Sequence, residues 1–187
     1  MNPTAYLSVL SVAERLKCNT RHSWTSSGRH ESVAEHSWRL ALMAFFMKDE
    51  FPALDMDKVI KMCLIHDLGE CFTGDIPTFQ KTQADEDRET KLLSDWVKSL
   101  PEPFASQMTA LYAEMDALET PEAKLYKSID KLEAVIQHNE SPISTWEPHE
   151  YELNRTYATD IVQFSDYLKV LRAEILKDTN DKIAAGK

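Results

Sequence analysis

The chain has 187 residues, which is enough for one domain with a sizeable hydrophobic core. Hydrophobic residues make up 43% of it and charged residues 28%, as in ordinary soluble globular proteins. Its 31 acidic and 21 basic residues leave a formal net charge of −10, which argues against a nucleic-acid or anionic-membrane surface. An anionic small molecule stays compatible with this charge if its site carries local positive charge.

The first residues and the cysteines of the chain indicate in which cellular compartment the protein is expected. The first residues show no basic region and no long apolar run, so we expect no signal peptide. No stretch approaches the roughly 18–20 apolar residues of a membrane span. The three cysteines include no CxxC pair, and Cys63 and Cys71 are too far apart for a disulfide if helical. We therefore expect a cytoplasmic protein with reduced cysteines.

Helical spacing of apolar residues runs almost throughout the chain, and only 4 glycines interrupt it. This pattern predicts an all-α protein of six or seven helices. The first helix is expected at about residues 3–17, followed by a polar loop with the sequence CNTRHSWTSSGRHE. This loop could be a solvated surface loop, or it could hold an anion or a base. The second helix is expected to begin at the capping box Ser32-Val33-Ala34-Glu35 and to end by about residue 50.

The third expected helix runs from an N-cap at Asp55 to about residue 72 and is apolar nearly all round, which is typical of a central, buried helix. Gly74 and Pro77 end it. The later helices are expected at about 84–100, from Pro103 to 118, from the Thr120-Pro121 start to 139, and at 154–177. Residues 1–178 are then one domain, and 179–187 a flexible tail.

Four polar side chains lie on or beside the inner faces of three of these helices. His36 shares an apolar stripe, His66 and Asp67 lie in the third helix, and Asp130 flanks the stripe of the sixth. Each residue alone fits a hydrogen-bonded buried pair better than a metal site. Together they favour a divalent cation, because it offsets carboxylates that would otherwise raise each other's pKa. Imidazole and carboxylate suit Mn, Fe, Co, Ni or Zn, whereas the lack of thiolate argues against a structural zinc site.

The order of these residues resembles that of the HD-domain phosphohydrolases, which are named for a metal-binding His-Asp doublet, here His66-Asp67. Three strings resemble the branch of the YfbR-type 5′-deoxynucleotidases: ESVAEHSWRLALMA, LIHDLGECFTGDIPT and PEAKLYKSIDKLEAVIQ. The resemblance covers about residues 7–140. It implies a helical bundle around one divalent metal, often in a homodimer, and hydrolysis of nucleoside 5′-monophosphates to nucleoside and phosphate.

The resemblance also implies roles for single residues. The metal ligands would be His36, His66, Asp67 and Asp130. Glu70 matches an acidic residue beside the metal, and Asp75 matches a second one near the leaving oxygen of the substrate. Arg21 matches an arginine that holds phosphate, and Trp24 is the candidate contact to the sugar or base.

The chemistry of these groups predicts a mechanism. Glu70 would orient or deprotonate the attacking water, and Asp75 would protonate the departing 5′-oxygen, although the two roles could be exchanged. No histidine lies between Asp67 and Ile129, so we expect one metal rather than two. Two alternatives stay open: an HD hydrolase of another phosphorylated metabolite, and a non-catalytic nucleotide-sensing HD domain. The presence of every ligand and both acids favours catalysis.

Overall fold

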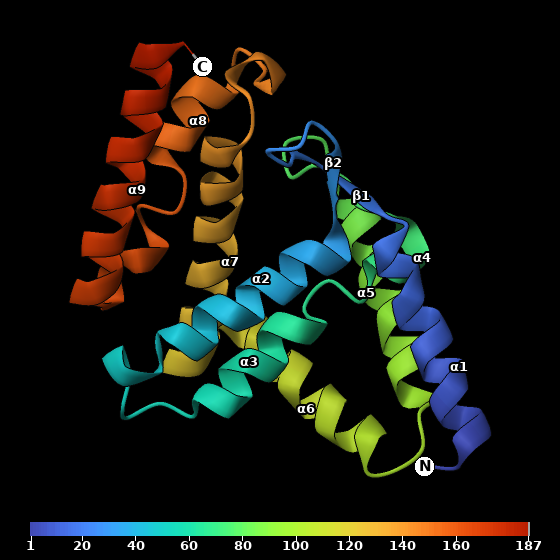
Figure 1. The fold of residues 1–187 in the computed structure, drawn as a ribbon. Helices are drawn as coiled ribbons and strands as arrows, with labels where there is room; N and C mark the ends of the chain where they lie inside the picture. Colours follow the sequence, from blue (N-terminus) through green and yellow to red (C-terminus); the bar gives the residue numbers. More distant parts are fainter. Residues whose placement is uncertain (187) are drawn as a thin grey trace.

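A computed structural model describes residues 1–186 of the chain, and it confirms the all-α prediction. The helices and strands of Figure 1 have the following bounds: α1 Pro3–Ala13, β1 Thr20–Trp24, β2 His30–Ser32, α2 Val33–Phe46, α3 Met56–Ile65, α4 Glu70–Thr73, α5 Gln83–Lys98, α6 Phe104–Ala117, α7 Pro121–Glu140, α8 Glu150–Thr156 and α9 Asp166–Ala185. The described residues therefore hold more helical segments than the six or seven expected. Short 3₁₀ turns follow α1 and α2 and also precede α8 and α9.

The main core forms where α2 and α3 cross α7, with α9 on the far side of α7 (Figure 1). Its fully buried side chains include Leu40 of α2, Val59 of α3, Leu132 of α7 and Leu168 of α9. Each such residue contributes about 1.5–3 kcal/mol through its removal from water. A second, smaller cluster around Leu16 joins the end of α1 to the helices α4, α5 and α6. No helix among residues 1–186 combines the length and the apolarity that crossing a membrane requires.

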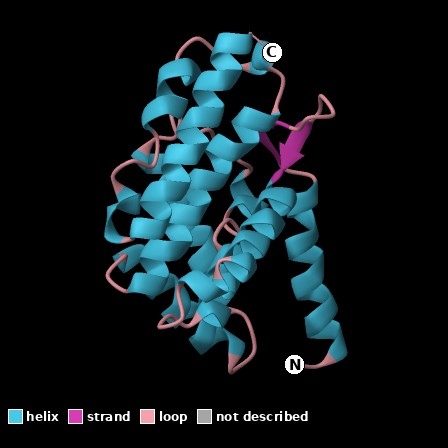
Figure 2. Ribbon diagram, turned by 60° about the vertical axis from the view of Figure 1, so that its left-hand side comes forward, coloured by secondary structure: helices cyan, strands magenta, loops and turns pink. Residues whose placement is uncertain are grey.

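The predicted polar loop at 18–31 is wrong in one respect, because it contains a small antiparallel hairpin (Figure 2). Thr20 pairs with Ser32 and Trp24 with His30, so β1 advances by four residues while β2 advances by two. The extra residues of β1 form a bulge, which redirects side chains toward the bundle. The turn depends on Gly28 at φ 81°, a conformation that favours glycine. Pairing between segments is a tertiary property, and no Asn-Gly or Asp-Gly signal marks this turn.

The third expected helix is also wrong, because it breaks at the His-Asp doublet. Helix α3 ends at Ile65 and α4 begins only at Glu70, with tight turns between them. At the break, the carbonyl of Ile65 accepts the N–H of Leu68 at 3.1 Å and also the hydroxyl of Tyr112 at 2.6 Å. Helix α3 is not buried all round either, since Leu64 is 48% exposed.

The last expected helix is replaced by two. Helix α8 ends at Thr156. Helix α9 begins at Asp166, twelve residues after the predicted start at residue 154. The segment 179–187, expected to be a flexible tail, is helical as far as Ala185, and Thr179 is buried against Asn139. Residue 187 of that segment lies outside the described residues. The predicted starts of α2 and α7 are confirmed: Ser32 forms its capping box with Glu35, and Thr120 accepts from the N–H of Ala123.

Candidate metal centre

His36 lies one turn into α2, and its side chain is fully buried. The capping box at Ser32 sets the start of the helix and hence the direction of this side chain. His36 Nδ1 donates to Glu133 Oε2 of α7 at 2.5 Å. The proton is thereby held on Nδ1, so Nε2, which lies 3.1 Å from Asp130 Oδ1, can bind a cation through its lone pair.

His66 shows the same arrangement with a different partner. Its Nδ1 donates to the backbone carbonyl of Cys63 at 2.9 Å, and its Nε2 is a buried nitrogen without a hydrogen-bond partner in residues 1–186. That nitrogen lies 3.0 Å from Asp67 Oδ2 and 3.6 Å from Asp130 Oδ1. A buried polar atom with no partner is costly, and a cation between these atoms would satisfy it.

The two carboxylates complete the cluster. Donor atoms of His36, His66 and Asp67 all lie within 4.8 Å of one another, and Asp130 Oδ1 is 3.1 Å from His36 Nε2. Burial opposes ionisation of Asp130, but Lys127 and the two imidazoles hold its pKa well below its usual range. The structure thus brings together all four predicted ligands, and the donor set of imidazole and ionised carboxylate fits a divalent metal.

Arg21 lies on the bulge of β1 with only 15% of its side chain exposed. Its Nε is 3.3 Å from Glu31 Oε2, and its Nη1 is 3.7 Å from Asp67 Oδ2. A guanidinium is therefore held beside the candidate metal ligands, as a phosphate-binding role requires.

Glu70 and Asp75 both lie near enough to Asp67 for its charge to act on them. Burial and the nearby charge of Asp67 raise the pKa of Glu70 to about 9. Burial also raises the pKa of Asp75. Both carboxyl groups therefore bind a proton more readily than free carboxyl groups do, which suits groups that transfer protons.

Trp24 is placed differently from the other predicted site residues. Its ring packs on His30 with the ring centroids 4.0 Å apart, and its carbonyl accepts from Gln137 Nε2 at 2.7 Å. None of the contacts that the structure gives Trp24 within residues 1–186 joins it to the four ligands. Its role at sugar or base stays a prediction without support from these contacts.

Sequence reasoning missed three charged residues at this centre. Glu133 contacts His36, Lys127 Nζ donates to Asp130 Oδ2 at 2.7 Å, and Glu31 contacts Arg21. Lys127 and Glu133 each lie three residues from Asp130 on α7, so the helical period could have indicated them. Glu31 precedes the helix and follows no such period. The donors of Glu31, Glu133 and His36 also cluster within 4.8 Å, but Arg21 and Arg39 already balance the charge of this second group.

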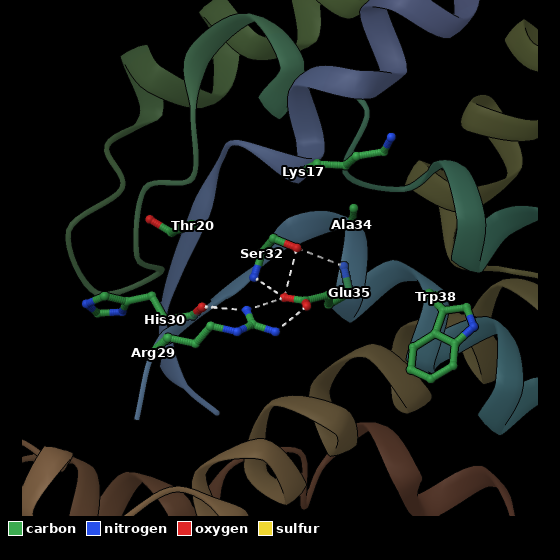
Figure 3. Close-up of a pocket in the computed structure, with 8 residues that line it drawn as sticks. All are labelled: Lys17, Thr20, Arg29, His30, Ser32, Ala34, Glu35 and Trp38. Carbon is green, nitrogen blue, oxygen red and sulfur yellow. Dashed lines mark hydrogen bonds and ion pairs between the residues drawn. The ribbon is translucent and has the colours of Figure 1, made fainter. Parts of the chain in front are cut away.

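A pocket of about 670 Å³ lies between the hairpin and the start of α2, and it is distinct from this centre (Figure 3). Its lining comprises Lys17, Thr20, Arg29, His30, Ser32, Ala34, Glu35 and Trp38. None of these is a predicted site residue. Figure 3 shows the Arg29 guanidinium paired with the Glu35 carboxylate, which offsets its charge.

Comparison with known proteins decides the family. The model of the HD domain matches residues 13–171, most of the chain. The chain belongs to the HD-domain family. The predicted resemblance is thereby confirmed.

Named relatives of this HD-domain chain are phosphohydrolases. Human 5′-deoxynucleotidase HDDC2 is 31% identical over 138 residues, which cover 72% of this chain and 67% of that protein. The 5′-deoxynucleotidase hdd1 of Schizosaccharomyces pombe is 26% identical over 190 aligned residues, covering 95% of this chain and 89% of that protein. The crystal structure of a predicted metal-dependent phosphohydrolase from Magnetospirillum magnetotacticum MS-1 superimposes with a TM-score of 0.79 at 27% identity, covering 96% and 93% of the two chains.

Proposed function

We propose that this HD-domain protein is a metal-dependent 5′-nucleotidase that hydrolyses (deoxy)nucleoside 5′-monophosphates to nucleoside and phosphate. The observation that carries the proposal is one constellation: two histidines and two aspartates from three segments converge beside Arg21 and two acids with raised pKa values. The relatives named 5′-deoxynucleotidase support the choice of substrate.

Each residue has a chemical part in this proposal. One divalent cation, held by His36, His66, Asp67 and Asp130, would polarise the phosphate and make bound water more acidic. Arg21 binds phosphate oxygens through its planar pair of N–H donors. Glu70 and Asp75 divide the two proton transfers between them: one accepts the proton of the attacking water, and the other protonates the departing 5′-oxygen.

Phosphate release from ribo- and deoxyribonucleoside 5′-monophosphates, with added Mn²⁺, Co²⁺, Ni²⁺, Fe²⁺ or Zn²⁺, tests the proposal. We expect release that depends on metal and disappears in Asp67→Ala together with metal binding. Lys91→Gln is a suitable control, because Lys91 is exposed and pairs only with Asp95. No release from any mononucleotide while metal is bound would refute the proposed activity, and activity in Asp67→Ala would refute the ligand assignment.

We infer that the protein works as a homodimer in the cytoplasm. Helix α1 has no buried residue and no charged one, and it exposes Tyr6, Leu7 and Leu10 by 54%, 65% and 46%. In a chain of net charge −10, an uncharged apolar surface is where two copies repel least. The three free cysteines fit a reducing compartment.

Light scattering after gel filtration tests the dimer. Leu7→Asp should convert dimers to monomers, whereas Asp87→Asn on exposed α5 should not. A wild-type chain that stays monomeric at high micromolar concentration would contradict the inference.

A further inference from the structure

The carboxylate of Asp130 is divided between two kinds of partner. Its Oδ1 faces the imidazoles, at 3.1 Å from His36 Nε2 and 3.6 Å from His66 Nε2. Its Oδ2 accepts a hydrogen bond from the ammonium group of Lys127 at 2.7 Å. The side chain of Asp130 is only 16% exposed, so this ammonium takes the place of bulk water at Oδ2. One oxygen therefore faces the candidate metal centre, and Lys127 holds the other.

The other cation beside this centre, Arg21, meets its aspartate in a different way. Arg21 Nη1 lies 3.7 Å from Asp67 Oδ2, and that same oxygen lies 3.0 Å from His66 Nε2. Arg21 thus approaches a carboxylate oxygen that faces an imidazole, as a group that binds phosphate at the metal would. Lys127 approaches the Asp130 oxygen that faces away from the imidazoles. Its position suits control of the carboxylate rather than contact with phosphate.

The ammonium of Lys127 is fixed in its place from two sides. Helix α7 places Lys127 three residues before Asp130, so that the two side chains meet on one face of the helix. The ammonium also lies 5.8 Å from the ring centroid of Tyr126, whose side chain is buried. Within residues 1–186, Asp130 is the only acid with which Lys127 forms an ion pair. No second carboxylate in this part of the chain therefore competes for the ammonium.

The division of the two oxygens matters because a carboxylate can bind a cation through one oxygen or through both. Four ligands with one atom each leave two positions on a six-coordinate cation, for water and for a phosphate oxygen. A second oxygen from Asp130 would take one of these positions. We propose that Lys127 is a positioning residue, which occupies Asp130 Oδ2 and so limits this ligand to one oxygen. The inference deepens the proposed nucleotidase function and rests on it.

Water-proton relaxation of the Mn²⁺ complex, measured without nucleotide, tests this role in Lys127→Met, which keeps the length of the side chain and removes its donor. We expect the relaxation due to Mn²⁺-bound water to fall to roughly half the wild-type value, because Asp130 Oδ2 takes one of two water positions. Calorimetry should show Mn²⁺ binding at least as tight as in the wild type. The kcat should fall about 10–100-fold. Lys127→Arg keeps a cationic donor and should restore the relaxation.

The matched control is Lys124→Met, which removes a positive charge one turn earlier on α7. It should leave the relaxation and kcat at their wild-type values. Equal changes in the Lys124 and Lys127 variants would overturn the inference, because they would show an effect of charge alone. Wild-type relaxation in Lys127→Met, or weaker Mn²⁺ binding there, would overturn it as well.

Failure of the proposed function is a separate outcome. The wild-type protein would then bind Mn²⁺ but release no phosphate from any mononucleotide. The relaxation and calorimetry measurements need no nucleotide, so they decide the role of Lys127 in either case.

Discussion

Among single residues, the pair of His36 and Glu133 matters most to the candidate metal centre. Both side chains are fully buried, and neither would be tolerable there alone. Their contact holds the proton on His36 Nδ1 and leaves Nε2 toward the other ligands. Arg39 Nε, 3.7 Å from Glu133 Oε1, offsets the negative charge from the other side. The orientation of the ligand is thus decided by a residue that would not touch the metal.

Glu133→Gln should weaken the binding of Mn²⁺ or Zn²⁺ by about 10–100-fold, because partners of this kind raise the basicity of a ligating histidine and fix its ring. Isothermal titration calorimetry measures the affinity directly. Glu140→Gln is the matched control, since Glu140 is on the same helix and binds the same Arg39 at 2.7 Å but is exposed. Equal affinities in the wild type and Glu133→Gln would contradict the role of Glu133.

Among the helices and strands, the start of α2 affects the candidate metal centre most directly, because its capping box fixes the helix that carries His36. The Ser32 hydroxyl accepts the N–H of Glu35 at 3.2 Å, and Glu35 Oε2 accepts the N–H of Ser32 at 2.8 Å. Arg29 reaches the same carboxylate from the hairpin. The start of the helix that carries His36 is therefore tied to the hairpin that precedes it.

Ser32→Ala should lower the free energy of unfolding by about 1 kcal/mol, as the loss of an N-cap usually does. Thr82→Ala removes the corresponding capping box of α5, which carries no candidate ligand. Urea unfolding should show a similar loss for both variants, while calorimetry should show weaker metal binding only for Ser32→Ala. Unchanged metal affinity in Ser32→Ala would show that this cap does not position His36.

Glu35 gives the cap a pH dependence. Hydrogen bonds from Arg29 lower the pKa of Glu35 to about 2, from 4.5. A carboxyl with a depressed pKa in the folded state contributes stability that is present above pH 4.5 and lost as the pH falls toward 2. Urea unfolding between pH 4.5 and 2 should thus show a shallower fall for Glu35→Gln than for the wild type. Parallel curves would contradict the contribution of Glu35.

At the scale of the whole molecule, the candidate ligands tie together three segments that are far apart in sequence. His36 belongs to α2, His66 and Asp67 to the turn after α3, and Asp130 to α7. These elements also make the main core, so a cation at this point would link the middle of the bundle. Binding to the folded state alone stabilises that state by mass action.

Addition of Mn²⁺ or Zn²⁺ at about 100 times its Kd should therefore stabilise the protein by about 2.7 kcal/mol. For a chain of this length that corresponds to a rise in Tm of roughly 5–10 °C, which EDTA should reverse. Differential scanning calorimetry measures the shift. Asp130→Asn should abolish the response, and a response of normal size in that variant would exclude Asp130 as a ligand.

Local sequence patterns determined much of this protein by themselves. Capping residues and helical periods placed the starts of α2 and α7, and they placed His36 in an inward stripe and Asp130 beside one. These predictions succeeded because a helix repeats every 3.6 residues and its ends need side-chain partners, both of which are short-range properties. The order of the HD motifs indicated the family for the same reason, since it is a property of the linear chain.

Only the tertiary structure decided the rest. The break at His66-Asp67, the hairpin that presents Arg21, and the location of Trp24 at His30 all depend on contacts between segments distant in sequence. The contact of Glu133 with His36 spans 97 residues, so no local period connects this pair. A buried charge is stable only beside its partner, and which residue becomes that partner is settled when the helices pack.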